Sequence, residues 1–305
     1  MSAWRPRNRS GLRQWCIGLI LATATVAVAS ATAFELPPIA QPASGEHHPG
    51  KMIWADLVTP DLVAAKRFYG GLFGWTFRDI HGRNTEYAVA LLDGAPVGGL
   101  VQRALRPHRH PAWLTFIAVK DIVAAERSVL THGGKEISQP RMYLQRGKQA
   151  VFADPQGAVF GALQSSSGDP ADVQALPGEW IWSSLVTSDP REAAAFYQAI
   201  LGYEIFDFPS DDGLEHLFLA TDNYARASSN TLPPGANTSP PHWLNFIRVS
   251  NAAEAAAKVR TLGGQVLVAP HPDRHGGMVA VVADPAGATF GLLEWTGTDS
   301  SEGAK

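Results

Sequence analysis

The sequence predicts an α+β fold built from two tandem copies of one module, and two observations support this prediction. An ordered set of motifs occurs twice, so that Trp54 recurs as Trp182 and Trp113 recurs as Trp243. The offset of about 130 residues is that of a domain-sized module rather than of a short solenoid repeat. Within each copy, segments with the alternating pattern of strands enclose segments with helical spacing. We therefore expect each module to contain a pair of βαβββ-like units.

The length and composition are sufficient for two hydrophobic cores. The chain has 305 residues, of which 45% are hydrophobic, and its formal net charge is −3. We place module 1 at residues 51–165 and module 2 at residues 179–297. The body of the chain has no sustained basic run, so we expect a small-molecule partner and no nucleic-acid groove.

The first unit of module 1 begins with an alternating pattern that predicts a strand at residues 52–58. A helix follows, because apolar residues recur at helical spacing from Leu62 to Leu72. Two strands at residues 87–92 and 99–102, separated by an Asp-Gly turn, complete the unit.

The second unit begins with a predicted strand at residues 114–119, which leads into a helix at residues 122–131. A glycine pair ends this helix, because glycine readily adopts the left-handed conformation found beyond a helix C-terminus. The last two strands, at residues 147–152 and 158–164, are joined by a turn with proline and glycine at the favoured positions. Module 2 repeats this pattern.

Residues 1–33 have the features of an export signal. Four arginines precede an apolar run at residues 15–29, and the small residues of Ala31-Thr32-Ala33 suit cleavage near Phe34. The run is shorter than the transmembrane length of about 20 residues, so an uncleaved membrane anchor is the alternative. We expect a periplasmic or secreted protein. The single cysteine, Cys16, lies within this run, so the mature chain would have none.

Three segments lack apolar periodicity. Residues 34–50 are rich in Pro, Gly and His and are expected to form a linker, as are residues 166–178 between the modules. Residues 298–305 form a polar tail.

Four motifs occur in both modules and in the same order. They are Trp54-x-x-Leu57-Val58-Thr59 and Trp182-x-x-Leu185-Val186-Thr187, Phe68-Tyr69 and Phe196-Tyr197, Gly133-Gly134 and Gly263-Gly264, and Asp154-Pro155-x-Gly157-Ala158 and Asp284-Pro285-x-Gly287-Ala288. Together they resemble the vicinal oxygen chelate superfamily, also called the glyoxalase, bleomycin-resistance and extradiol-dioxygenase group. The resemblance covers nearly all of the chain after residue 50. It implies two tandem glyoxalase-like modules, each with a curved mixed sheet and flanking helices.

The resemblance also implies a divalent metal, held by His, Gln and Glu side chains with open positions for two substrate oxygens. Carried onto this chain, the ligand positions are Trp54, Leu114 and Gly161 in module 1 and Trp182, Leu244 and Gly291 in module 2. None can bind a metal, because an indole N–H only donates, leucine is apolar and glycine has no side chain. We therefore expect that both metal sites are lost and that the protein uses no cofactor.

Several histidines lie near these positions. His110 and His242 precede the strands that carry Leu114 and Leu244, and His271 and His275 belong to a polar loop of module 2. We interpret them as exposed loop residues rather than replacement ligands.

We predict that the former metal cavity is an aromatic-lined pocket. The candidate ligand-binding residues are Trp54, Asp56, Trp113, Thr115, Trp182, Ser184, Trp243 and Asn245. Phe116, Phe246, Phe160 and Phe290 would add to the lining. The alternative is that the tryptophans pack in the core. Alternation along a strand places Asp56 and Ser184 on the same face as Trp54 and Trp182.

Three functions are compatible with these features. The first is an exported protein that binds a small, partly hydrophobic molecule without a metal. The second is a lyase, isomerase or dioxygenase with unusual residues, in which Asp56 could act as acid or base. The third is a structural or interaction module with no ligand. The sequence identifies no catalytic residue, and it leaves open whether the modules pair within one chain or across a homodimer.

Overall fold

The computed structural model describes residues 34–82, 85–105, 110–210, 212–232, 240–273 and 276–295. The predicted export signal and the polar tail lie outside these ranges. The fold and the site belong to the second of two compact units, Phe34–Lys305. Within the described ranges, no helix is both long and apolar enough to span a membrane.

Module 1 forms one eight-stranded sheet with two helices. Its elements are β1 (Met52–Thr59), α1 (Leu62–Phe73), β2 (Thr76–Gly82), β3 (Thr85–Leu92), β4 (Ala95–Gln102), β5 (Ala112–Ala118), α2 (Ile122–Thr131), β6 (Lys135–Tyr143), β7 (Gly147–Ala153) and β8 (Val159–Ser165). The strand order is β2-β3-β4-β1-β5-β8-β7-β6.

Module 2 repeats this arrangement with its own eight strands. Its elements are β9 (Trp180–Thr187), α3 (Pro190–Leu201), β10 (Glu204–Asp207), β11 (His216–Thr221), β12 (Tyr224–Thr231), β13 (His242–Val249), α4 (Ala252–Thr261), β14 (Gln265–Pro272), β15 (Met278–Ala283) and β16 (Thr289–Glu294). The strand order is β10-β11-β12-β9-β13-β16-β15-β14.

The sheet topology joins two βαβββ units in each module. In module 1, β1 runs parallel to β4 and β5 runs parallel to β8, while β1 and β5 pair antiparallel at the centre. Module 2 pairs β9, β12, β13 and β16 in the same way. The sheets are therefore mixed and curled, which confirms the predicted fold class.

The two edge strands of each sheet, β2 and β6 in module 1, were absent from the strands predicted from the sequence. Most of their residues are exposed, so they lack the apolar alternation that marks a half-buried strand. The predicted list of strands was therefore wrong at the sheet edges.

The helix of each unit in module 1 begins at a side-chain cap. Asp61 accepts a hydrogen bond from the Ala64 backbone N–H, and Asp121 accepts one from Val123. Gly74 ends α1 with φ of 76°, a conformation that favours glycine.

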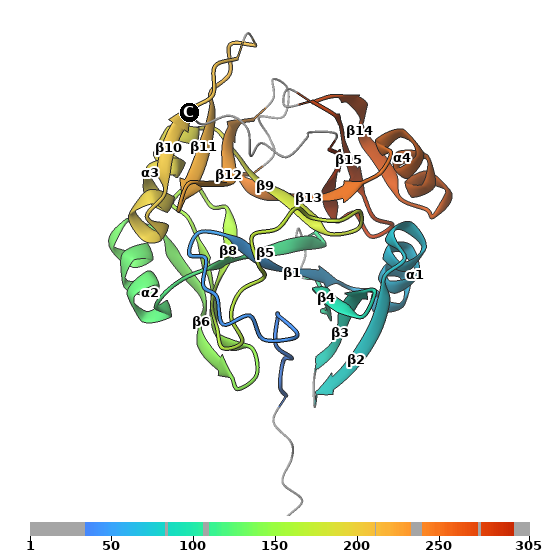
Figure 1. Ribbon diagram of the computed structural model, residues 1–305, viewed down its shortest axis with the longest axis horizontal. Helices are drawn as coiled ribbons and strands as arrows, with labels where there is room; N and C mark the ends of the chain where they lie inside the picture. The colour runs from blue at the N-terminus through green and yellow to red at the C-terminus, as the bar shows by residue number, and fades with distance from the viewer. Residues whose placement is uncertain are drawn as a thin grey trace, which may run out of the picture. The chain divides into compact units, whose positions relative to one another are not determined.

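Both helix-side cores are shared between the modules. Helix α1 packs against α4, and its Phe68 and Tyr69 contact Phe290 of β16. Helix α2 likewise packs against α3, in a core that includes Val129 and Tyr197. Figure 1 shows these two helix pairs on opposite flanks of the modules. The modules therefore pair within one chain, each unit packing against the opposite unit of the other module.

A cluster of ions joins the segment before β9 to both modules. Asp172 lies 2.9 Å from Nζ of Lys51, next to β1, and 2.6 Å from Nη1 of Arg226 on β12. The ring of His48 approaches the other Asp172 carboxylate oxygen at 3.3 Å. Burial alone would raise the pKa of Asp172, but hydrogen bonds and charge from Arg226 and Lys51 outweigh burial and lower this pKa to about 2. Through these ion pairs, the charged Asp172 connects the segment at 166–178 to both modules.

Candidate functional site

Each sheet has a face that packs against the helices and an opposite face, which we call the concave face. Trp54 and Asp56 lie on the concave face of module 1, opposite Phe116 and Leu114 of β5. Phe116 in turn pairs with Gly161 of β8. The structure therefore brings the three residues at the family's ligand positions, Trp54, Leu114 and Gly161, to one surface.

Asp56 is at the centre of a buried polar cluster on this face. Its Oδ1 accepts hydrogen bonds from Nε1 of Trp54 at 2.8 Å and from the Tyr87 hydroxyl at 2.7 Å. Burial raises the pKa of Tyr87 well above its usual value although the nearby Arg146 opposes this, so the phenol is neutral and donates. The side chains of Trp54, Asp56 and Tyr87 are all less than a tenth exposed.

Arg146 completes the cluster. Its guanidinium lies 4.2 Å from the Trp54 ring centroid and its Nη1 donates to the Tyr87 hydroxyl at 3.3 Å. This side chain is fully buried. Tyr87 and Arg146 are not among the candidate residues predicted from the sequence. An arginine in a hairpin between polar neighbours is usually a surface residue, so its sequence position carried no signal.

Residues 34–39 fill the concave face of module 1. Leu36 and Ile39 are 3% and 2% exposed and pack with Trp54, Tyr87 and Phe116. Figure 1 shows this segment, in blue, running beside the sheet of module 1. We had expected a linker at residues 34–50. The segment has no helix and no strand before Met52, but its apolar side chains belong to the core.

The concave face of module 2 has a different polar cluster. Nε1 of Trp182 donates to the Ser228 hydroxyl at 3.1 Å, and the Ser184 hydroxyl lies 2.8 Å from the same oxygen. Asn230 donates to Ser228 at 2.9 Å, and Nδ1 of His216 lies 2.9 Å from Oδ1 of Asn230. The strand register places His216 where module 1 has Tyr87.

The two concave faces differ in exposure. Trp54 and Phe116 are 2% and 1% exposed, whereas their counterparts Trp182 and Phe246 are half-buried. Tyr87 is also buried, and its counterpart His216 is half-buried. Residues 34–39 account for the difference, because they pack onto module 1. Among the described residues, the concave face of module 2 is therefore less deeply buried than that of module 1.

Trp113 and Trp243, also candidates for the pocket, lie on the helix-side faces. Nε1 of Trp113 donates to the Tyr69 hydroxyl at 2.9 Å, and that hydroxyl lies 3.2 Å from Oδ2 of Asp284 in the other module. The same relay joins Trp243 to Tyr197 and Asp154, with the same distances. Burial raises the pKa of Asp284 and of Asp154. These relays connect the modules and do not line the concave faces.

Thr115 and Asn245 lie between the modules. The Thr115 hydroxyl donates to Oδ1 of Asn245 at 2.8 Å, and the Ser183 hydroxyl donates to the same oxygen at 2.7 Å. Phe160 and Phe290, which we expected to line the pocket, lie in the helix-side cores, because strand alternation turns them away from the concave faces. The structure thus keeps Trp54, Asp56, Trp182, Ser184, Phe116 and Phe246 on the concave faces.

The family's metal ligands do not fit the residues present. A Cβ atom at Gly161 would overlap the ring of Phe116, and one at Gly291 would overlap the ring of Phe246. The phenyl rings therefore occupy the space where the family places its glutamate. Across the described ranges, no group of three or more His, Cys, Asp or Glu residues could hold a metal.

The histidines near these positions are placed in different ways. Nδ1 of His242 lies 2.9 Å from the Pro240 carbonyl, and Nδ1 of His271 lies 3.0 Å from the Ala269 carbonyl. His110 is exposed. His275 lies outside the described residues.

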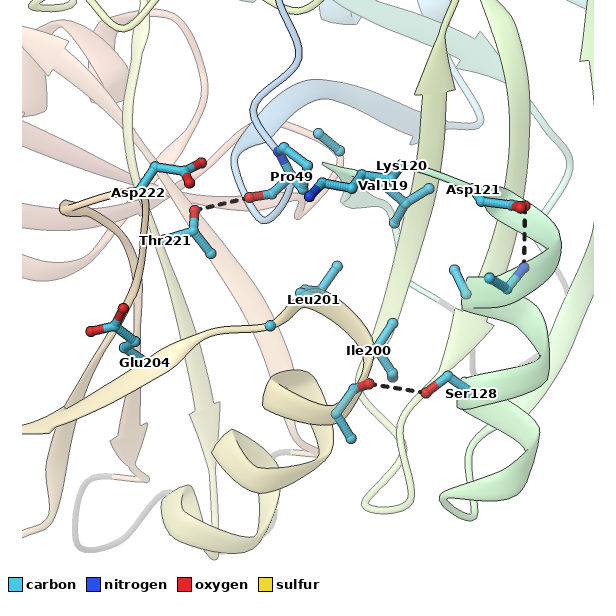
Figure 2. A pocket seen from close by; sticks show the side chains of 15 residues that line it. Pro49, Val119, Lys120, Asp121, Ser128, Ile200, Leu201, Glu204, Thr221 and Asp222 are labelled. Carbon is cyan, nitrogen blue, oxygen red and sulfur yellow. Dashed lines mark hydrogen bonds between the residues drawn. The ribbon is translucent and has the colours of Figure 1, made fainter.

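A surface groove of about 530 Å³ lies where α2 meets α3 (Figure 2). Three of its polar groups serve the fold. Asp121 caps α2, the Ser128 hydroxyl donates to the Ala199 carbonyl, and the Thr221 hydroxyl donates to the Pro49 carbonyl. The groove lies on the helix side, away from both concave clusters.

Known proteins share both modules. The family model described as Glyoxalase/Bleomycin resistance protein/Dioxygenase superfamily matches residues 181–292, and one described as Glyoxalase-like domain matches residues 52–163. The protein named "Putative glyoxylase CFP32" of Mycobacterium tuberculosis is 32% identical over 257 residues, covering 83% of this chain and 98% of that protein.

A second relative is the Anthracycline biosynthesis protein DauV of Streptomyces sp., 32% identical over 260 residues that cover 81% of this chain and 94% of the relative. Among solved structures, the Mn(II)-bound glyoxalase from Novosphingobium aromaticivorans aligns with a TM-score of 0.57 and 16% identity. The alignment covers 81% of this chain and 82% of that glyoxalase. With both modules matched and two relatives above 30% identity along most of its length, this chain belongs to the glyoxalase, bleomycin-resistance and dioxygenase superfamily as a two-module member.

Proposed function

We propose that this chain is an exported protein that binds a small, partly hydrophobic molecule on the concave face of module 2 without a metal. The observation that carries the proposal is the half-buried pair of Trp182 and Phe246 beside the hydrogen-bonded Ser184 and Ser228. Ligand sites combine apolar walls with a few placed polar groups, and this surface offers both.

The chemistry of this surface favours an aromatic ligand that carries oxygen atoms. The indole of Trp182 offers a ring for stacking, and the Ser184 hydroxyl can make a further hydrogen bond while it contacts Ser228. Two relatives are named for anthracycline biosynthesis, DauV and DnrV. An anthracycline is therefore the first class of ligand to test.

The arrangement supports binding more than catalysis. The carboxylate that could act as acid or base, Asp56, is buried and bound to Trp54 and Tyr87, which pack against Leu36 and Ile39. Its counterpart in module 2 is Ser184, whose hydroxyl is bound to Ser228. We infer that module 2 holds its ligand by stacking and hydrogen bonds.

The proposal is tested by titrating an anthracycline into the purified protein in the presence of EDTA and following tryptophan fluorescence. Replacing Trp182 by Ala removes an aromatic wall worth about 1.5–3 kcal/mol, so affinity should fall at least about tenfold. Trp54→Phe is the matched control, because Trp54 occupies the same position under residues 34–39. Equal affinity of wild type and Trp182→Ala would reject module 2 as the site, and binding that EDTA abolishes would reject the metal-free mechanism.

A further inference from the structure

Residues 34–39 contact the concave face of module 1 through side chains and backbone in the manner of a bound peptide. Leu36 and Ile39 are buried in the cluster around Trp54. The Pro37 carbonyl accepts a hydrogen bond from Nε of Arg146 at 3.0 Å. Glu35 accepts one from the Leu144 backbone N–H at 2.9 Å. The sheet thus receives the apolar anchors, while the turn between β6 and β7 binds one backbone carbonyl and one carboxylate of the segment.

The surface that receives the segment is built from module 1 itself. Arg146 is held against Trp54 and the Tyr87 hydroxyl, and within the described part of the chain its Nη2 makes no hydrogen bond. A buried guanidinium with donors to spare suits a ligand that presents carbonyl oxygens. Phe34 adds an edge-to-face contact with Tyr87, at 6.2 Å between ring centroids.

The connection between this segment and the rest of the chain is exposed. Residues 41–47 are exposed, and the chain regains backbone contacts near Gly45, which donates to the Ser167 carbonyl. An exposed connection of this kind lets the segment leave the face while both modules stay folded.

We infer that the concave face of module 1 is a binding site for an extended, proline-containing apolar peptide, occupied in cis by residues 34–39 of the same chain. The two modules have therefore diverged. Module 1 uses the family's cleft to hold the start of its own folded unit, and in module 2 Trp182 and Phe246 on the corresponding face are less deeply buried. This inference does not depend on a ligand for module 2.

A cysteine reporter tests the inference in the full chain. Cys16 is the sole cysteine, so a Cys16→Ser background allows one thiol to be introduced by Ile39→Cys, on the buried face, and by Ala43→Cys as the exposed control. Labelling by a thiol reagent then reports how often each position is open to solvent. A synthetic peptide with the sequence of residues 34–42 is added in trans as the competitor.

We expect the thiol at position 39 to label at least tenfold more slowly than the one at position 43. The short connection gives residues 34–39 an effective concentration of about 1 mM at the concave face. Free peptide at a few mM should therefore displace the segment and raise the labelling rate at position 39 severalfold. A matched peptide with serine in place of both apolar anchors should have no effect.

Two results would overturn the inference. Equally fast labelling at both positions would show that the segment is not docked. Slow labelling that the peptide leaves unchanged would show that the segment is an integral part of module 1 rather than the occupant of a site. Leu36→Cys provides a second buried reporter should Ile39→Cys fail to fold, as judged by circular dichroism.

Discussion

Replacing Asp172 by Asn removes the carboxylate that ties the segment at 166–178 to Lys51 and Arg226. The pKa of this carboxyl is about 2 in the folded protein, against an ordinary value of 3.8. A difference of this size corresponds to about 2 kcal/mol of stability at neutral pH. The side chain is only 14% exposed, so solvent screening does not cancel this contribution.

The sign of the pH dependence follows from the lowered pKa. Because the folded pKa lies below the unfolded one, the stabilisation is present above about pH 4 and is lost as the pH falls towards 2. Urea unfolding of the wild type and of Asp172→Asn at pH 7 should differ by about 2 kcal/mol, and at pH 3 by about half as much. Glu204→Gln, at an exposed acid, is the control. A difference below about 0.5 kcal/mol at pH 7, or one that is the same at both pH values, would refute the assigned role of Asp172.

Three further predictions concern the buried contacts. Tyr69→Phe removes the hydroxyl that links Trp113 to the carboxylate of Asp284 in the other module. The free energy of unfolding, measured by urea denaturation, should fall by about 1–3 kcal/mol. An unchanged free energy of unfolding would show that this hydrogen-bonded relay is dispensable. Gly161→Ala places a methyl group where it overlaps the ring of Phe116. The free energy of unfolding should fall by about 1–3 kcal/mol, which would be measured as a lower Tm. An unchanged Tm would show that the space beside Gly161 is free. Arg146→Met removes the donor to the Pro37 carbonyl and should speed thiol labelling at position 39 about tenfold. Arg141→Met, an exposed change in the same hairpin, should leave the labelling rate unchanged. Equal rates in the two variants would refute the role of Arg146.

The sequence was informative where burial is one-sided and periodic. The helix predicted at residues 122–131 has those bounds in the structure, because its Asp121 cap and following glycine pair mark both ends. The strands at the sheet edges were missed for the opposite reason, since most of their residues are exposed and the few half-buried ones form no regular alternation. The helices and strands that could be predicted from the sequence are therefore those with one buried face, whatever the secondary-structure propensity of their residues.

For the site, strand alternation predicted part of the geometry. It placed Asp56 beside Trp54, and the structure has both on the concave face. The same rule argues against Trp113, because Leu114 was already assigned to that face and adjacent strand residues point to opposite faces. The same alternation turns Trp113 towards the core, where it lies.

The remaining parts of the site depend on tertiary contacts that leave no local pattern. Arg146 is buried only because residues 34–39 cover it and Trp54 lies beneath it. Leu36 and Ile39 are isolated apolar residues among prolines, which resemble a linker until the sheet that receives them is known. The hydroxyl cluster around Ser228 depends in the same way on the pairing of β9 with β12.

The metal content of the purified protein decides whether this superfamily member works without the family's metal. The untagged protein is incubated with Zn²⁺, Mn²⁺, Fe²⁺ and Ni²⁺, dialysed extensively and analysed by mass spectrometry. The rings of Phe116 and Phe246 over Gly161 and Gly291 predict retention far below one ion per chain. Stoichiometric retention of any of the four ions would show that the chain still holds a metal site.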